Sequence, residues 1–113
     1  MNWHWREKPD PDQEYLEYSE QLTFESYRPL LNFLWDRQKI ISQLKKSEGL
    51  LGFVTHLNFR KRSLNLISVW QNEKNLSRFL NTNPYVTAML RYHSQVHHKT
   101  NRSARYGSEF TAY

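Results

Sequence analysis

An arginine stands in the middle of an apolar helical stripe, which is an unusual place for a permanent charge. Between residues 29 and 46 the apolar side chains recur about every 3.6 residues, as in an amphipathic helix. Arg37 falls within that stripe. Because an unpaired buried charge is costly, its guanidinium needs an acceptor or an anion. Arg37 is therefore a candidate catalytic residue that stabilises an anionic substrate. The alternative is that its stem lies along the apolar surface and its charge stays in water.

A second group of residues is suited to a small-molecule pocket. Such pockets are mostly apolar, with a few polar groups that orient the ligand. The candidates for substrate binding combine both kinds: Phe53, Thr55, Ser68, Tyr85, Met89 and Tyr92. Trp70 is the second candidate catalytic residue, at the end of a predicted strand. The alternative is that all of these side chains fill the core and leave no pocket.

Three of the five histidines lie close together near the C-terminus: His93, His97 and His98. On a helix, His93 and His97 could ligate one metal ion because they are four residues apart. The nearest acids in the sequence are Glu73 and Glu109, so no third ligand is evident. We therefore expect no metal and a solvated basic helix. His56 is expected to be a hydrogen-bonded interface residue rather than a base.

The elements that position these residues follow the β-α-β-β-α-β order of a split βαβ arrangement. Strands are predicted where apolar residues alternate, and helices where they recur every three to four residues. The predicted strands span 14–24, 50–59, 63–70 and 102–113, and the predicted helices span 29–46, 73–80 and 85–97. The expected fold is α+β and ferredoxin-like, with an antiparallel sheet. The domain covers residues 14–113 and follows an N-terminal arm over residues 1–13.

Both faces of the predicted central hairpin carry apolar side chains. On its first strand, Leu51 and Phe53 are expected to share one face, while Val54 lies with Ile67 and Val69 on the other. A sheet with one wet face would alternate more cleanly. We therefore expect helices on one face and a second subunit on the other, which makes a homodimeric α/β barrel. Trp3 and Trp5 are expected to dock as well, for example on that second subunit.

Composition limits the remaining classes of function. The chain of 113 residues has no cysteine, which fits a reducing compartment such as the cytoplasm. No apolar stretch approaches the roughly 18 residues that a membrane helix needs. The net charge of +5 includes the basic run 60–62, which could contact the phosphates of RNA. The predicted third strand lacks the aromatic residues of the common RNA-binding module. Nucleic acid is therefore not the expected partner, and an RNA-binding module is the second alternative.

A family resemblance spans residues 29–93. It consists of a helix that ends in a glycine turn, a hairpin, a strand that closes with Ser-x-Trp, and an acidic residue that opens the next helix. The matching residues are Gly49-Leu50-Leu51-Gly52, the run from Leu66 to Glu73, Leu76, Phe79, Asn83-Pro84 and Met89. In this pattern the chain resembles the antibiotic-biosynthesis-monooxygenase-like superfamily of dimeric α/β barrels.

That resemblance implies a cofactor-independent monooxygenase-like protein, acting on a small aromatic or quinol-type substrate between sheet and helices. In several such oxygenases the strand-ending tryptophan faces the pocket, and Trp70 matches it by position. Haem-degrading relatives carry a histidine ligand near the position of Met89, and an asparagine on the first strand that residues 14–24 lack. No cofactor is expected, with haem left open. The first alternative is a non-catalytic dimer, either structural or binding a small ligand, so whether the chain is an enzyme also stays open.

Overall fold

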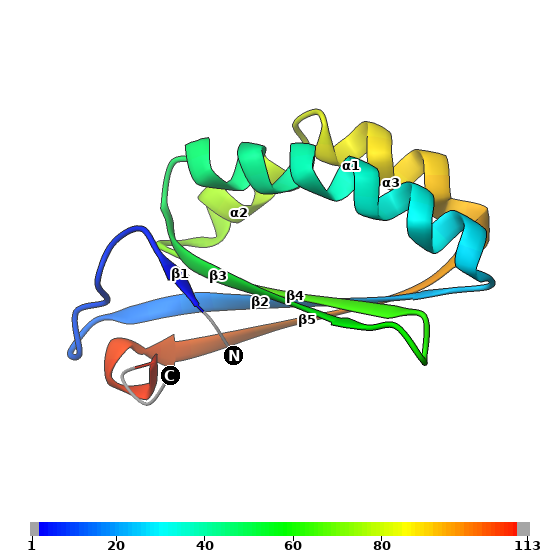
Figure 1. The fold of residues 1–113 in the computed structure, drawn as a ribbon. Helices are drawn as coiled ribbons and strands as arrows, with labels where there is room; N and C mark the ends of the chain where they lie inside the picture. Colours follow the sequence, from blue (N-terminus) through cyan, green and yellow to red (C-terminus); the bar gives the residue numbers. More distant parts are fainter. Residues whose placement is uncertain (1–2, 111–113) are drawn as a thin grey trace.

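A five-stranded antiparallel sheet carries three helices on one of its faces (Figure 1). The computed structural model describes residues 3–110. The strand order is β1-β3-β4-β2-β5. The elements are β1 (His4–Trp5), β2 (Glu14–Phe24), α1 (Tyr27–Lys46), β3 (Leu50–Asn58), β4 (Ser63–Trp70), α2 (Glu73–Leu80), α3 (Tyr85–Tyr92) and β5 (Val96–Tyr106), with 3-10 turns at His93–Gln95 and Gly107–Phe110. The ferredoxin-like α+β fold expected from the sequence is confirmed.

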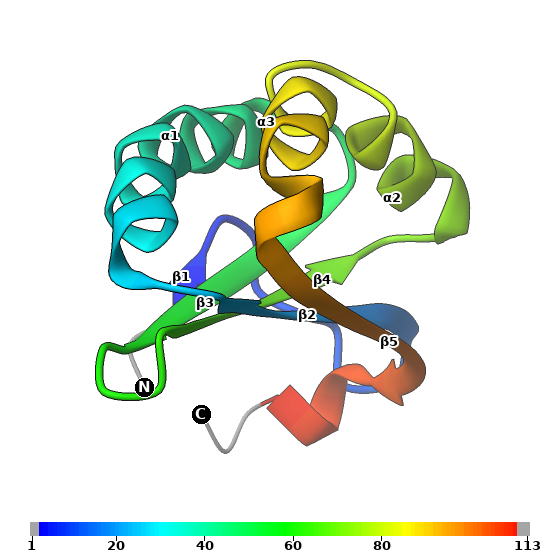
Figure 2. The ribbon, with the colours of Figure 1, turned by 90° about the vertical axis from the view of Figure 1, so that its right-hand side faces the viewer.

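The main core lies between the helices and the inner face of the sheet. Apolar stripes on α1, α2 and α3 pack against inward side chains of β2, β3 and β4, and Figure 2 shows the helices as one layer above the strands. Asn72 begins α2 by accepting a hydrogen bond from the Asn75 amide at 2.9 Å, as its sequence position favours. None of the helices within residues 3–110 combines the length and the hydropathy that crossing a bilayer requires.

The C-terminal part of the chain differs from the prediction. Helix α3 ends at Tyr92 rather than at residue 97, and β5 starts at Val96 rather than at residue 102. Most residues of this edge strand are exposed, so its sequence has no apolar alternation that would mark a strand. His93 and His97 therefore do not form a pair on one helix. The predicted strand residues 111–113 lie outside the described part of the chain.

An irregularity in β3 reverses the direction of one side chain. Leu50 pairs with Trp70, whereas Gly52 already pairs with Val69, so an extra residue stands between them. Leu51 was expected to share a face with Phe53, and this is wrong. It packs instead in the cluster on the outer face of the sheet, because a bulge changes the alternation of the strand that carries it.

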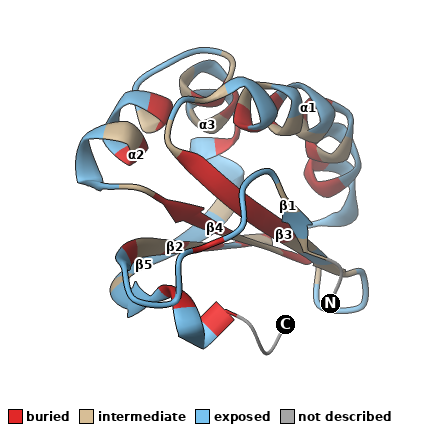
Figure 3. Ribbon diagram, turned by 90° about the vertical axis from the view of Figure 1, so that its left-hand side faces the viewer, coloured by how far each residue is buried: buried red, intermediate tan, exposed pale blue. Residues whose placement is uncertain are grey.

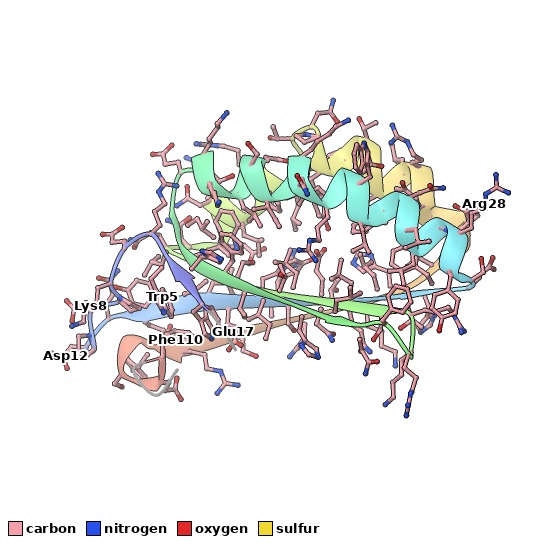
Figure 4. All side chains as sticks on the ribbon, viewed as in Figure 1. Trp5, Lys8, Asp12, Glu17, Arg28 and Phe110 are labelled. Carbon is pink, nitrogen blue, oxygen red and sulfur yellow. The ribbon has the colours of Figure 1, made fainter. Side chains whose placement is uncertain are left out.

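The N-terminal arm covers part of this outer face. Its strand β1 pairs with β3, and the rings of Trp3 and Trp5 stack with centroids 4.9 Å apart. Trp5 also lies 5.9 Å from Phe110, and Figure 4 shows both at the same end of the sheet. In Figure 3, β3 is coloured mostly as buried, whereas much of the helix surface is coloured as exposed. The two tryptophans thus pack on their own chain, next to Leu51 and Val69.

Candidate functional site

A small cavity lies between the sheet and the helices. It measures about 20 Å³, which is close to the space that a single water occupies. Arg37, Thr55, Tyr85 and Met89, which were predicted site residues, all line it. The other lining residues come from the same core layer: Glu20, Leu22, Phe33, Ile40, Ile41, Leu64 and Leu66.

The remaining predicted site residues lie elsewhere in the core. Trp70 is fully buried and donates a hydrogen bond from Nε1 to Oγ of Ser68 at 2.8 Å. Phe53 stacks on His4, and the Tyr92 hydroxyl donates to Asp36 at 2.8 Å. None of these four predicted residues lines the cavity. In the structure, Trp70 and Ser68 therefore pack in the core, against the inner face of the sheet.

The main feature of the site is a buried carboxylate that was not among the residues predicted from the sequence. Glu20 is only 4% exposed and lies on the inner face of β2 between Tyr18 and Leu22. Its Oε1 atom accepts hydrogen bonds from the hydroxyls of Tyr18, at 3.0 Å, and of Tyr85. The same oxygen lies 3.2 Å from Nε2 of His98. The signal was present, because strict alternation along residues 16–24 places Glu20 on the apolar face.

The two tyrosines act as fixed donors to this carboxylate. Burial, together with the negative charge of Glu20, raises the pKa of Tyr85 and of Tyr18 well above the ordinary tyrosine range. Both hydroxyls therefore keep their protons at neutral pH. Since a buried charge is stable only when it is hydrogen-bonded, these donors allow an ionised carboxylate inside the core.

Strand pairing explains why His98 reaches Glu20. Leu22 is the direct partner of His98 across β2 and β5, so the imidazole starts two register positions from Glu20, on the same inner face. The His98 side chain is 32% exposed, whereas that of Glu20 is 3% exposed. With Glu20 ionised, Nε2 donates to the carboxylate and Nδ1 carries a free lone pair. This arrangement suits a histidine base that is oriented by an acid.

Arg37 completes the polar part of the cavity. Its side chain is half-buried, and among residues 3–110 it makes no hydrogen bond or ion pair. Its donors are therefore available for an anion. The neighbouring Asp36 is already occupied by Arg91, whose Nη1 lies 2.7 Å from its Oδ2. This second cluster ties α1 to α3, and we assign it a structural role.

An open hollow of about 810 Å³ between the C-terminal half of α1 and α2 lacks comparable chemistry. Its ionisable side chains, Lys39, Lys46, Glu48 and Arg78, are all exposed. Among residues 3–110, no group of three or more histidine, aspartate or glutamate side chains is arranged to hold a metal ion.

Comparisons with solved structures give the same fold. A conserved protein of unknown function from Bacteroides thetaiotaomicron superposes with a TM-score of 0.71 at 12% identity, covering 81% of this chain and 98% of its own. A variant of SnoaB, a cofactor-independent oxygenase from Streptomyces nogalater, gives 0.65 at 11% identity, covering 79% and 90%. A candidate antibiotic biosynthesis monooxygenase from Nitrosomonas europaea gives 0.66 at 10% identity, covering 83% and 91%.

No protein-family model and no curated protein sequence matches the chain. The structural likeness shows the fold alone, which this chain shares with the oxygenase SnoaB and with the candidate antibiotic biosynthesis monooxygenase. The resemblance first noted around Trp70 is confirmed at that level.

Proposed function

We propose that the chain is a cofactor-independent monooxygenase-like protein that acts on a small aromatic or quinol-type substrate. The observation that carries this proposal is the pair formed by His98 and buried Glu20 beside the cavity. A histidine that is oriented by a buried carboxylate is suited to act as a general base. The cofactor-independent oxygenase among the structural neighbours has the same architecture and supports the reaction class.

The proposed chemistry begins with a proton. His98 accepts it from the substrate through Nδ1, while Glu20 stabilises the resulting imidazolium through Nε2. Arg37 donates hydrogen bonds to the substrate oxyanion. Dioxygen then oxidises the electron-rich anion, giving one oxygen atom to the product and the other to water. This reaction reduces dioxygen by four electrons. Because no cofactor supplies them, all four come from the substrate, whose reacting carbon is oxidised from a methylene to a carbonyl.

A second candidate function is ligand binding without turnover. It is favoured by the closed packing of Trp70 on Ser68 and by a cavity of only about 20 Å³. In that case His98 and Glu20 hold a ligand hydroxyl and do not transfer its proton. The two functions differ in whether oxygen is consumed.

Oxygen uptake, measured with an oxygen electrode, distinguishes catalysis from ligand binding. Anthrone, an aromatic ketone with an acidic methylene, is mixed with protein, and oxygen uptake is corrected for spontaneous oxidation. We expect His98→Gln to lower kcat by about a hundredfold or more, because it removes a general base. His56→Gln, which changes an exposed histidine on the other face of the sheet, is expected to leave kcat unchanged. Equal oxygen uptake by wild type and His98→Gln would refute the proposed enzyme.

We also propose that the protein is a cytoplasmic homodimer that pairs through the outer face of the sheet. The absence of cysteine from the sequence supports the compartment. The two ends of the molecule differ in charge: segment 7–14, which includes Lys8 and Asp12 and has four acids against one lysine, lies at one end, and Arg28 lies at the other (Figure 4). Arg62 lies over the ring of Tyr27, which brings the basic turn 60–62 to the same end as Arg28. Two copies packed antiparallel would place opposite charges together.

Light scattering coupled to size-exclusion chromatography measures this association. A mass of twice 13.8 kDa is expected at low salt, and Ile67→Glu on the outer face is expected to give the monomer mass. A monomer at all protein concentrations would refute the dimer without affecting the proposed site.

A further inference from the structure

The buried cavity is too small for the proposed substrate. Its volume of about 20 Å³ holds roughly one water, whereas sites for small organic ligands measure roughly 300–1,000 Å³. A bicyclic or tricyclic aromatic ring therefore needs a larger space that adjoins both His98 and the cavity.

Such a space lies beside α3. A groove of about 430 Å³ runs between α3 and β5, with His98 in its wall. Figure 2 shows the chain leaving α3 and descending into β5, with α2 to the side. Two residues, Tyr85 and Met89, line both this groove and the buried cavity. They form the partition between the two spaces.

The two residues of that partition are held differently. The Tyr85 hydroxyl is fixed by its hydrogen bond to Glu20, and the residue is buried. Met89 is half-buried and has no polar tie. Methionine has several rotatable bonds and adapts readily to its neighbours. Met89 is therefore the part of the partition that can change its rotamer without breaking a hydrogen bond.

We propose that the groove between α3 and β5 is the outer compartment of the same site. In this proposal, which rests on the proposed function, the groove holds the aromatic rings of the ligand and brings its hydroxyl to His98, and Met89 moves aside so that the ligand also reaches Arg37 in the cavity. Apolar side chains of the groove supply contact area, among them Val86 and Leu90, which is 73% exposed.

The lining chemistry favours a weakly acidic hydroxyl on the ligand. His93, His97 and His98 border the groove, and its lining within residues 3–110 includes no carboxylate. An imidazole accepts the proton of a phenol as a hydrogen bond and, once protonated, donates to the phenolate. The ligand class is therefore an aromatic of two or three fused rings with a phenolic or enolic hydroxyl.

Titration with two matched probes tests the proposal without turnover. 1-Naphthol carries the hydroxyl, whereas 1-methoxynaphthalene has it blocked, and both are followed by fluorescence. We expect 1-naphthol to bind about fivefold more tightly, the effect of one net hydrogen bond. His98→Phe should remove that preference while both probes still bind. Leu90→Glu should weaken both probes at least tenfold.

Leu31→Glu is the matched control, because Leu31 is an exposed leucine on α1 outside the groove, and it should leave both affinities unchanged. If Leu90→Glu and Leu31→Glu have the same effect, or if neither probe binds, the groove is not the outer compartment. Oxygen uptake with an unaltered KM in Leu90→Glu would also overturn the groove and leave the enzyme proposal standing. Probe binding in the groove without any oxygen uptake would support the groove and overturn the enzyme proposal.

Discussion

The Nε2 atom of His98 lies 3.2 Å from the Oε1 atom of Glu20, on neighbouring strands and 78 residues apart in the chain. Glu20 has almost no exposed surface, and His98 keeps about a third of its side chain in contact with solvent. A proton on this imidazole can therefore exchange with water, while the carboxylate that orients it stays in the core.

Replacing this carboxylate affects stability as well as chemistry. Glu20→Ala leaves the hydroxyls of Tyr18 and Tyr85 without their shared acceptor. We expect the free energy of unfolding to fall by about 2–4 kcal/mol, because buried donors are left unpaired. Urea denaturation measures the change. Glu25→Ala, which truncates an exposed glutamate just after β2, is expected to stay within about 0.5 kcal/mol of wild type. An equal loss in both variants would contradict the buried acceptor.

The tyrosines predict a stability change at alkaline pH. Burial and the charge of Glu20 raise the pKa of Tyr85 in the folded chain. A tyrosine in the unfolded chain has a pKa of about 10. Below that pH both states are protonated, and Tyr85 adds no pH dependence. Above it, only the unfolded state loses the proton, so stability falls as pH rises. Tyr85→Phe should make this fall less steep in denaturation curves measured from pH 9 to 11.

Absorbance at the tyrosinate band provides the control for this prediction. Because burial and Glu20 raise its pKa in the folded protein, Tyr85 should contribute to this absorbance only on unfolding. Complete ionisation before unfolding would show that the hydroxyl is not buried against Glu20.

Trp70→Ala is expected to be a stability variant. Trp70 was predicted to be a catalytic residue of the substrate pocket, whereas the structure places it fully buried against Phe79, with ring centroids 5.4 Å apart. We expect a loss of about 3–5 kcal/mol in unfolding free energy, as for other large-to-small changes in cores. Trp35→Ala is the matched control, since Trp35 is 78% exposed. A stable Trp70→Ala protein with no ligand affinity would restore the original assignment.

Gly52 allows a test of the N-terminal arm. A Cβ atom at this position would lie 2.4 Å from Cε3 of Trp5, which is closer than atoms can pack. Gly52→Ala should therefore push Trp5 off the sheet and shift tryptophan fluorescence to longer wavelength. In a Trp5→Ala background the same change should cost little stability, because the clash is gone. Additive effects of the two substitutions would show that Trp5 does not rest on Gly52.

The regular elements of the fold follow from local patterns. The bounds of β2, β4 and α2 agree with the predicted ranges, because each has a clear alternation, periodicity or cap. The start of β5 could not be predicted in this way, since an edge strand with both faces exposed has no apolar signal. The side change of Leu51 depends on a bulge, which is a property of the pairing between two strands.

The site was predictable only in part. Arg37, Thr55, Tyr85 and Met89 could be placed at the cavity because helix and strand periodicity fixes the direction of their side chains. The approach of His98 to Glu20 depends on the register of β2 with β5, which no local pattern determines. Similarly, the cover that the arm gives to Val69 was ascribed to a second subunit, because contacts between distant segments do not show in the sequence.

Strand β5 is also a long open border of the sheet, and such borders can recruit further strands and start fibrils. It runs for 11 residues at one edge and carries Lys99, Arg102 and Arg105 along that length. A second β5 laid alongside would bring these cations face to face, and like charges on paired strands repel. The basic residues along β5 therefore disfavour pairing of this edge with a second copy of itself.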